Sequence, residues 1–209
     1  AAGVMVQGGI GTAMVLENGN EEQKQKWIVP AIKGAKIGAF GLTEPNAGSD
    51  AAAIEGTAVK KGDKYIINAT KMFITNGSIA DFVCVAAYTD KSKGPKGGVS
   101  IIIVDKGTPG FRVSRKLKKL GYHSSATAEL VFNDCEVPAS NLIGVEGKGF
   151  PYLMTTLKSG RISHAARSLG MTEAAYEASL KYANERVQFG KPIGKNQAIA
   201  FKIVNMATE

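Results

Sequence analysis

The spacing of apolar residues changes twice along this chain of 209 residues, and that change constrains its fold most. Between residues 38 and 133, short β-branched and aromatic runs alternate with turn signals such as Asn76-Gly77 and Thr108-Pro109-Gly110. The expected strands are 38–42, 56–60, 64–75, 82–89, 98–105, 110–113 and 126–133. Because no helical pattern separates these runs, we predict an antiparallel barrel or sandwich.

Both flanks of this β region have helical spacing. Residues 1–37 are expected to be helical, with Glu21 and Glu22 in a first turn, Pro30 bending or ending the helix, and Gly34 stopping it. After Pro138, apolar residues recur every three or four positions as far as Val187, which predicts one long helix that Gly190-Lys191-Pro192 ends. A further helix is expected over 197–207.

The predicted fold class is therefore α+β, with a helical N-terminal segment, an antiparallel β-barrel middle domain and a helical C-terminal segment. We expect the domain boundaries to be 1–37, 38–145 and 146–209. The chain begins without Met and stops inside a helical pattern, so we expect both of its ends to be cut.

The formal net charge of +8 favours an anionic partner, either nucleic acid or a polyphosphate cofactor. Clustered lysines occur at Lys116, Lys118 and Lys119, but no aromatic stacking platform accompanies them, which disfavours nucleic acid. That cluster is interpreted as a solvated strand end or as a surface facing an acidic ligand. No apolar run is long enough to cross a bilayer, so no membrane span is expected.

Cys84 and Cys135 lie among strand-like apolar residues and are expected to be buried, reduced thiols. This predicts a reducing compartment rather than a secreted protein. The two cysteines, His123 and His164 lack metal-ligand spacing, so no metal site is predicted. Gly9-Ile10-Gly11 follows no strand and lacks a third glycine, which excludes a dinucleotide-binding turn.

Four segments carry residues suited to binding, although each also has an ordinary structural interpretation. Residues 40–50 form a strand and a loop with hydroxyls and exposed amides, which suit a phosphate or an electron-poor ring but also suit a surface turn. Residues 71–77 place an aromatic ring and a hydroxyl on one strand face, or simply end a hairpin. Gly160-Arg161 lies within a helix, and residues 185–197 place an arginine and an aromatic residue at a helix end.

Taken in order, these segments resemble the acyl-CoA dehydrogenase family over essentially the whole chain. The matching motifs are Gly41-Leu42-Thr43-Glu44-Pro45 through Gly48-Ser49-Asp50, Lys71 through Gly77, Lys119-Leu120-Gly121 with Ser125-Ala126-Thr127, Phe132 through Pro138, Gly160-Arg161-Ile162 and Arg186 through Pro192. The resemblance, on the short-chain, butyryl-like branch, implies a helix, β, helix domain order and a homotetramer, or a homodimer, that shares FAD across subunits.

The resemblance also implies residue roles. FAD would be held by Phe40, Leu42, Thr43, Gly48, Ser49, Phe73, Ile74 and Thr75, and by Arg186, Phe189 and Gln197 acting on a neighbouring subunit's cofactor. Substrate would be met by Ser49, Lys158, Ser159, Gly160 and Arg161. Many members carry Trp in place of Phe73 and Asp in place of Lys158. One branch places its catalytic Glu where Gly160 stands, so no catalytic residue is assigned here and the base is expected after Glu209.

The implied function is FAD-dependent α,β-dehydrogenation of an acyl-CoA thioester to the trans-2-enoyl-CoA in fatty acid β-oxidation. Electrons would pass to an electron-transfer flavoprotein, in bacterial cytoplasm or mitochondrial matrix. The fragment is expected to be inactive alone. The alternatives are an acyl-CoA oxidase-like flavoprotein on the same scaffold and a non-catalytic flavin- or CoA-binding module.

Overall fold

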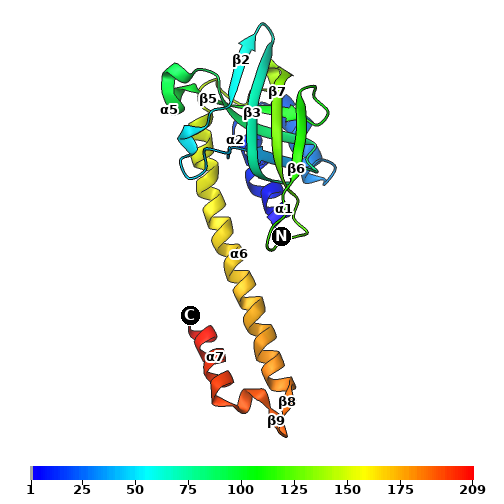
Figure 1. Cartoon of the computed structure of the whole chain (residues 1–209), viewed down its shortest axis with the longest axis vertical. Helices are drawn as coiled ribbons and strands as arrows, with labels where there is room; N and C mark the ends of the chain where they lie inside the picture. The colour runs from blue at the N-terminus through cyan, green and yellow to red at the C-terminus, as the bar shows by residue number, and fades with distance from the viewer. Residues whose placement is uncertain (1) are drawn as a thin grey trace. The chain divides into compact units, whose positions relative to one another are not determined.

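The computed structural model describes residues 2–209, which form two compact units. The first unit comprises residues 1–160 and the second comprises residues 161–209. Figure 1 shows the order of elements, with short helices first, then the sheet, then two further helices. The predicted α+β class is confirmed, and each unit is described by itself below.

Short helical segments occupy the N-terminal region, as predicted. They are α1 (Ala2–Met5), η1 (Val6–Ile10), α2 (Ala13–Asn18), α3 (Glu21–Gln23), η2 (Lys24–Ile28) and α4 (Val29–Ile32). Asn20 and Gln23 form a reciprocal capping box, which explains why α3 begins at Glu21. Pro30 lies inside α4, and the helix ends two residues later, just before Gly34 with φ of 74°. Two segments are π-helical, which the apolar spacing did not predict.

All seven predicted strands are present in one sheet. They are β1 (Gly38–Gly41), β2 (Thr57–Lys61), β3 (Lys64–Thr75), β4 (Phe82–Tyr88), β5 (Val99–Asp105), β6 (Phe111–Lys116) and β7 (Thr127–Pro138). The strand order is β1-β4-β2-β3-β7-β6. The remaining strand, β5, also pairs with β4 but lies outside this order. The strand expected over 126–133 continues to Pro138. Short helices η3 (Ala51–Ala53), η4 (Lys91–Lys93), α5 (Gly94–Gly98) and η5 (Ala139–Asn141) lie in the connections.

The expectation of a purely antiparallel sheet is wrong at β4, which runs parallel to β1 and, where Thr57 meets Tyr88, also to β2. A parallel pair needs a long connection, because the chain must return to the same end of the sheet. Here that connection is the loop after β1 together with the β2–β3 hairpin, so both segments are positioned relative to β1.

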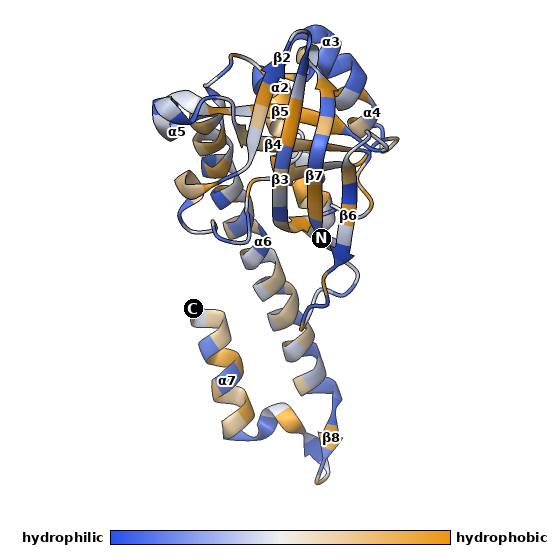
Figure 2. Ribbon diagram, turned by 45° about the horizontal axis from the view of Figure 1, so that its top comes forward, coloured by the Kyte–Doolittle hydropathy of each residue, from blue (hydrophilic) through white to orange (hydrophobic). Residues whose placement is uncertain are grey.

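The core is built around β4 and β5. Every residue of β4 is buried, since one strand face packs against the N-terminal helices and the other against β3 and β7. Figure 2 shows the apolar residues along these strands. Trp27 donates its indole N–H to Asp105 over 2.6 Å, which connects the helices to the end of β5.

Both cysteines are free and buried, as predicted. Burial raises the pKa of the Cys84 thiol to about 12 and that of Cys135 to about 11. Neither thiol is therefore a reactive thiolate at neutral pH.

The second unit contains the later turns of α6 (Gly149–Glu185), β8 (Val187–Gln188), β9 (Lys191–Pro192), η6 (Ile193–Lys195) and α7 (Gln197–Thr208). The predicted continuation of the long helix to Val187 is wrong, because Val187 pairs with Pro192 in the β8–β9 hairpin. Apolar side chains of the predicted stripe, including Ile162 and Leu169, are exposed in this chain. Among the described residues, no helix is long and apolar enough to span a membrane.

Candidate functional site

The loop after β1 and the end of β3 lie side by side in the first unit. The carbonyl oxygen of Thr43 accepts a hydrogen bond from the backbone N–H of Met72 over 2.8 Å. Residues separated by nearly thirty positions in the sequence therefore meet where β1 ends. The two segments that the family resemblance assigns to the flavin are neighbours, as that interpretation requires.

A buried ion pair fastens these two segments together. The Lys71 ammonium lies 2.6 Å from Oε1 of Glu44, and the side chains are 0% and 5% exposed. Lys71 also donates to the carbonyl oxygen of Leu42 over 3.2 Å. Burial lowers the pKa of Lys71, and the carboxylate of Glu44 opposes that shift.

The Glu44 carboxylate also binds the backbone at the C-terminal end of the loop that follows β1. It accepts hydrogen bonds from the backbone N–H groups of Glu55 at 2.6 Å and Gly56 at 3.0 Å. A Cβ atom added to Gly56 would lie 2.7 Å from Oε1 of Glu44 and 2.8 Å from Cβ of Ala69. Because Glu44 and Ala69 approach so closely, only glycine fits at position 56. The Glu44 carboxylate thus contacts both Lys71, next to the start of the loop, and the backbone at the end of the loop.

Phe73 stands on a bulge of β3. Lys71 pairs with Leu130 and Ile74 pairs with Ala128, so β3 has one residue more than β7 between these pairs. At the bulge, Phe73 adopts φ of 58° and the residue is 65% exposed. A positive φ is strained for a bulky side chain, and strain of this kind is often found at functional sites.

Two other predicted residues point elsewhere. The side chains of Leu42 and Ile74 are buried in the hydrophobic core. Only their backbone groups are thus available to a bound molecule. Thr75, the last residue of β3, pairs with Thr127, and it precedes Asn76, whose side chain donates to the carbonyl oxygen of Gly3 over 3.0 Å.

The tip of the loop offers hydrogen-bond donors. Glu44 and Ala47 exchange backbone hydrogen bonds of 2.9 and 3.2 Å, which forms a tight turn. Beyond it, Gly48 and Ser49 are exposed, and their backbone N–H groups have no partner among the residues that the structure describes. Successive N–H groups without partners are suited to an anion or a polarised carbonyl.

The remaining predicted residues lie on helices. Lys158, Ser159 and Gly160 are on α6 within the first unit, whereas Arg161 begins the second unit. Arg186, Phe189 and Gln197 all belong to the second unit, where Phe189 is 96% exposed at the tip of the β8–β9 hairpin. The β1 loop and the β3 bulge thus lie together in the first unit. Arg186, Phe189 and Gln197 belong to the second unit.

Gly160 is not required by packing within this chain. An added Cβ would meet only the side chain of Ile10, at the ordinary contact distance of 3.6 Å. We therefore expect Gly160→Ala to raise the free energy of unfolding by about 0.5–1 kcal/mol, the difference in helix propensity. Urea unfolding followed by circular dichroism measures this, and a clear loss of stability would contradict the contact distances.

Comparison with known proteins shows the family to which this chain belongs. Residues 39–135 match the acyl-CoA dehydrogenase middle domain, and residues 147–209 match the acyl-CoA dehydrogenase C-terminal domain. An acyl-CoA dehydrogenase of Bacillus subtilis is 50% identical over 100% of this chain and 55% of its own length. A short-chain specific acyl-CoA dehydrogenase of Megasphaera elsdenii is 52% identical over 90% of this chain and 49% of its own.

Solved structures of other proteins are also similar to this chain in fold and in sequence. A chain from the structural study of the electron transferring flavoprotein of Acidaminococcus fermentans has a TM-score of 0.92 and 51% identity. The match covers 98% of this chain and 54% of that one, so this chain spans about half the length of its relatives. With a β1 loop and a β3 bulge joined by a buried ion pair, and with both domain models matched in order, the chain belongs to the acyl-CoA dehydrogenase family, on its short-chain side.

Proposed function

We propose that this chain is the flavin-binding part of an enzyme that oxidises an acyl-CoA thioester to the trans-2-enoyl-CoA. The observation that carries the proposal is the contact between the Thr43 loop and the Phe73 bulge, which presents an exposed ring and unpaired N–H groups on neighbouring segments. Such a surface suits a flat, polar heterocycle, because the ring can pack on it and its carbonyls can accept hydrogen bonds.

The residues present fit FAD. Phe73 would pack against the flavin, while the hydroxyl of Thr75 and the backbone of Thr43 would bind its polar edge. Gly48 and Ser49 would donate N–H groups. Bound FAD would supply the hydride acceptor, which no side chain in the chain can replace. Arg186, Phe189 and Gln197 of the second unit would reach the FAD of a neighbouring subunit in a homotetramer.

The proposed acyl-CoA contacts are Ser49, Lys158, Ser159, Gly160 and Arg161. The relatives are about twice as long as this chain, and the general base, a Glu by family resemblance, is proposed to lie after Glu209. The exposed stripe of α6 supports the proposal that further protein covers that helix in the assembled enzyme. An electron-transfer flavoprotein would accept the electrons, in bacterial cytoplasm or mitochondrial matrix.

Titration of the purified chain with FAD tests the proposal. Quenching of flavin fluorescence and a resolved flavin absorption band are expected, and their absence at micromolar protein would exclude a flavin site in this chain. Without the base, butyryl-CoA should leave that band unbleached. In a full-length protein, anaerobic bleaching by butyryl-CoA followed by slow reoxidation in air is expected. Rapid peroxide formation would instead identify an oxidase.

A further inference from the structure

A pocket with no described lining residue from the Thr43 loop lies between the end of β6, the loop that follows it and the turn after β3. Its volume is about 530 Å³, and every residue that lines it belongs to the first unit. The lining residues are Ser78, Ile79, Lys116 through Lys119, and His123 through Thr127. None of the residues assigned above to FAD or to the substrate lines this pocket, although its lysines include the cluster interpreted above as a solvated strand end or as a surface facing an acidic ligand.

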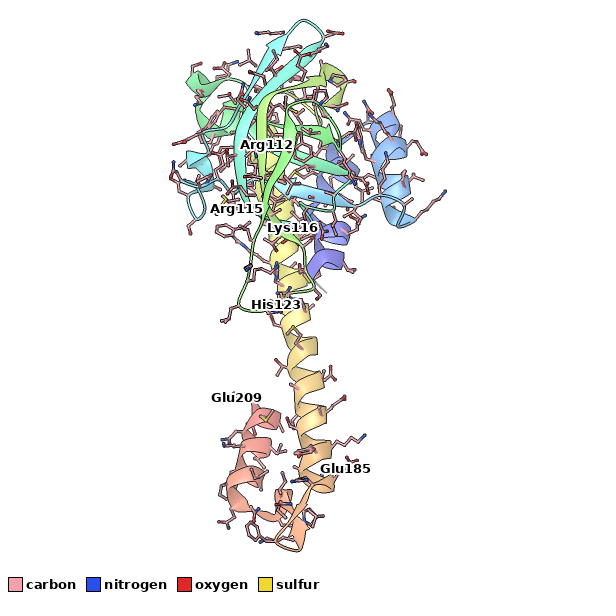
Figure 3. The ribbon with its side chains drawn as sticks, turned by 45° about the vertical axis from the view of Figure 1, so that its right-hand side comes forward. Arg112, Arg115, Lys116, His123, Glu185 and Glu209 are labelled. Carbon is pink, nitrogen blue, oxygen red and sulfur yellow. The ribbon has the colours of Figure 1, made fainter. Side chains whose placement is uncertain are left out.

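The lining is strongly cationic. Lys116, Lys118, Lys119 and His123 contribute basic groups, and no acidic residue is present among the described lining residues. Figure 3 shows Lys116 at the end of β6 and His123 on the loop that follows. Like charges that line one pocket repel one another unless an anion neutralises them, so this lining favours a bound anion.

Ser78 provides an independent observation. Its hydroxyl oxygen is buried, yet it has no hydrogen-bond partner among the residues that the structure describes. Buried polar atoms are nearly always hydrogen-bonded, and one that is not calls for a ligand or an ordered water. Because Ser78 lines the cationic pocket, a ligand with acceptor oxygens would satisfy it.

The loop that walls the pocket is held in place before any ligand binds. The Lys119 ammonium donates to the carbonyl oxygen of Ser125 and to the hydroxyl of Thr127, the latter over 2.9 Å. A ring nitrogen of His123 lies 2.8 Å from the carbonyl oxygen of Lys119. The backbone N–H of Leu117 donates to Thr127 at the start of β7 over 2.8 Å. A preorganised wall lowers the entropy cost of binding.

We propose that this pocket binds the phosphate or diphosphate group of a small molecule. Ser78 donates its hydroxyl hydrogen to a phosphate oxygen, and the ammonium groups of Lys116 and Lys118 neutralise its charge. The volume exceeds that of a single phosphate and accommodates a diphosphate. Among the described lining residues there is no Phe, Tyr or Trp, which argues against stacked nucleic-acid bases. The proposal stands whether or not the Thr43 loop binds flavin.

Calorimetric titration of the chain with inorganic pyrophosphate tests this proposal. Binding in the micromolar to millimolar range is expected. Ser78→Ala should weaken it about tenfold, as expected for a lost hydrogen bond to a charged group. It should leave the unfolding midpoint unchanged, since the hydroxyl has no protein partner. Lys118→Gln should also weaken binding, while Lys61→Gln, which removes an exposed lysine of β2 from outside the pocket, should not.

The source of the phosphate is decided by repeating the titration with FAD present. If FAD prevents pyrophosphate binding, the pocket takes the diphosphate of the dinucleotide; if both bind together, it takes a separate phosphorylated molecule. Either result supports an oxyanion site. The proposal is overturned if the wild-type chain binds no pyrophosphate, or if Ser78→Ala and Lys118→Gln bind it as the Lys61→Gln control does.

Discussion

Replacement of Lys71 by methionine is expected to lower the free energy of unfolding by about 3–5 kcal/mol, the usual cost of removing one partner of a buried ion pair. The methionine fills similar space, but it leaves the Glu44 carboxylate buried without its cation. Because that carboxylate also holds Glu55 and Gly56, the loop should loosen at both ends. Chemical denaturation followed by tryptophan fluorescence measures the change, with Trp27 as the probe in the first unit.

The same strand offers a matched control for this substitution. Lys64 pairs with Glu136 at 3.1 Å, but both side chains are half exposed, so Lys64→Met should leave the midpoint nearly unchanged. The double variant Glu44→Gln/Lys71→Met should be less destabilised than the sum of its single variants, since neither charge is then buried alone. Strict additivity of the two single effects would show that the ion pair contributes no coupling.

The alternation of inward and outward residues along β3 could have indicated the ion pair of Lys71 and Glu44 from the sequence. Tyr65, Ile67 and Lys71 share the inward face of the strand by their alternation, so the pattern places a charged residue at a buried position, which our sequence analysis did not note. A buried ammonium needs a buried carboxylate, and Glu44 stands in the other motif of the candidate site. The motifs were identified from the sequence as two binding segments, but the bond between them was missed, because no local pattern reports which segments meet in space.

Strand positions were predictable for a local reason, and strand partners were not. Turn residues mark where each strand ends, so the seven runs were found. The parallel pairing of β1 with β4 depends on the long connection between them, which carries no local signal of direction. Likewise, Val187 continues the helical spacing of α6, yet its backbone pairs with Pro192, because the hairpin competes with the last helical turn.

The bulge at Phe73 is a second feature that the sequence could not give. An extra residue in β3 is visible only in its register with β7, although the resemblance to a flavoprotein family had marked Phe73 as a cofactor contact. The structure adds a physical reason to single it out, since a bulky residue there keeps a strained φ of 58° and an exposed ring. An arrangement that costs stability and gains no packing within the chain is expected where a ligand supplies the compensation.

Phe73→Gly is therefore expected to change stability and cofactor affinity in opposite directions. Glycine adopts positive φ without strain, so the free energy of unfolding should rise by about 1 kcal/mol. Loss of the ring should weaken FAD binding about 10- to 100-fold, because an aromatic face and its buried area are both removed. Urea unfolding of the cofactor-free chain and fluorescence titration with FAD measure the two effects separately.

Phe201→Ala on α7 is the matched control, since Phe201 is 60% exposed compared with 65% for Phe73, and it has no proposed role. It should leave FAD affinity as it is in the wild-type chain. Phe73→Ala keeps the strained backbone while removing the ring, so it should lose affinity without the gain in stability. If Phe73→Gly gains stability but binds FAD as tightly as the wild type, the strain at the bulge has another cause and the flavin lies elsewhere.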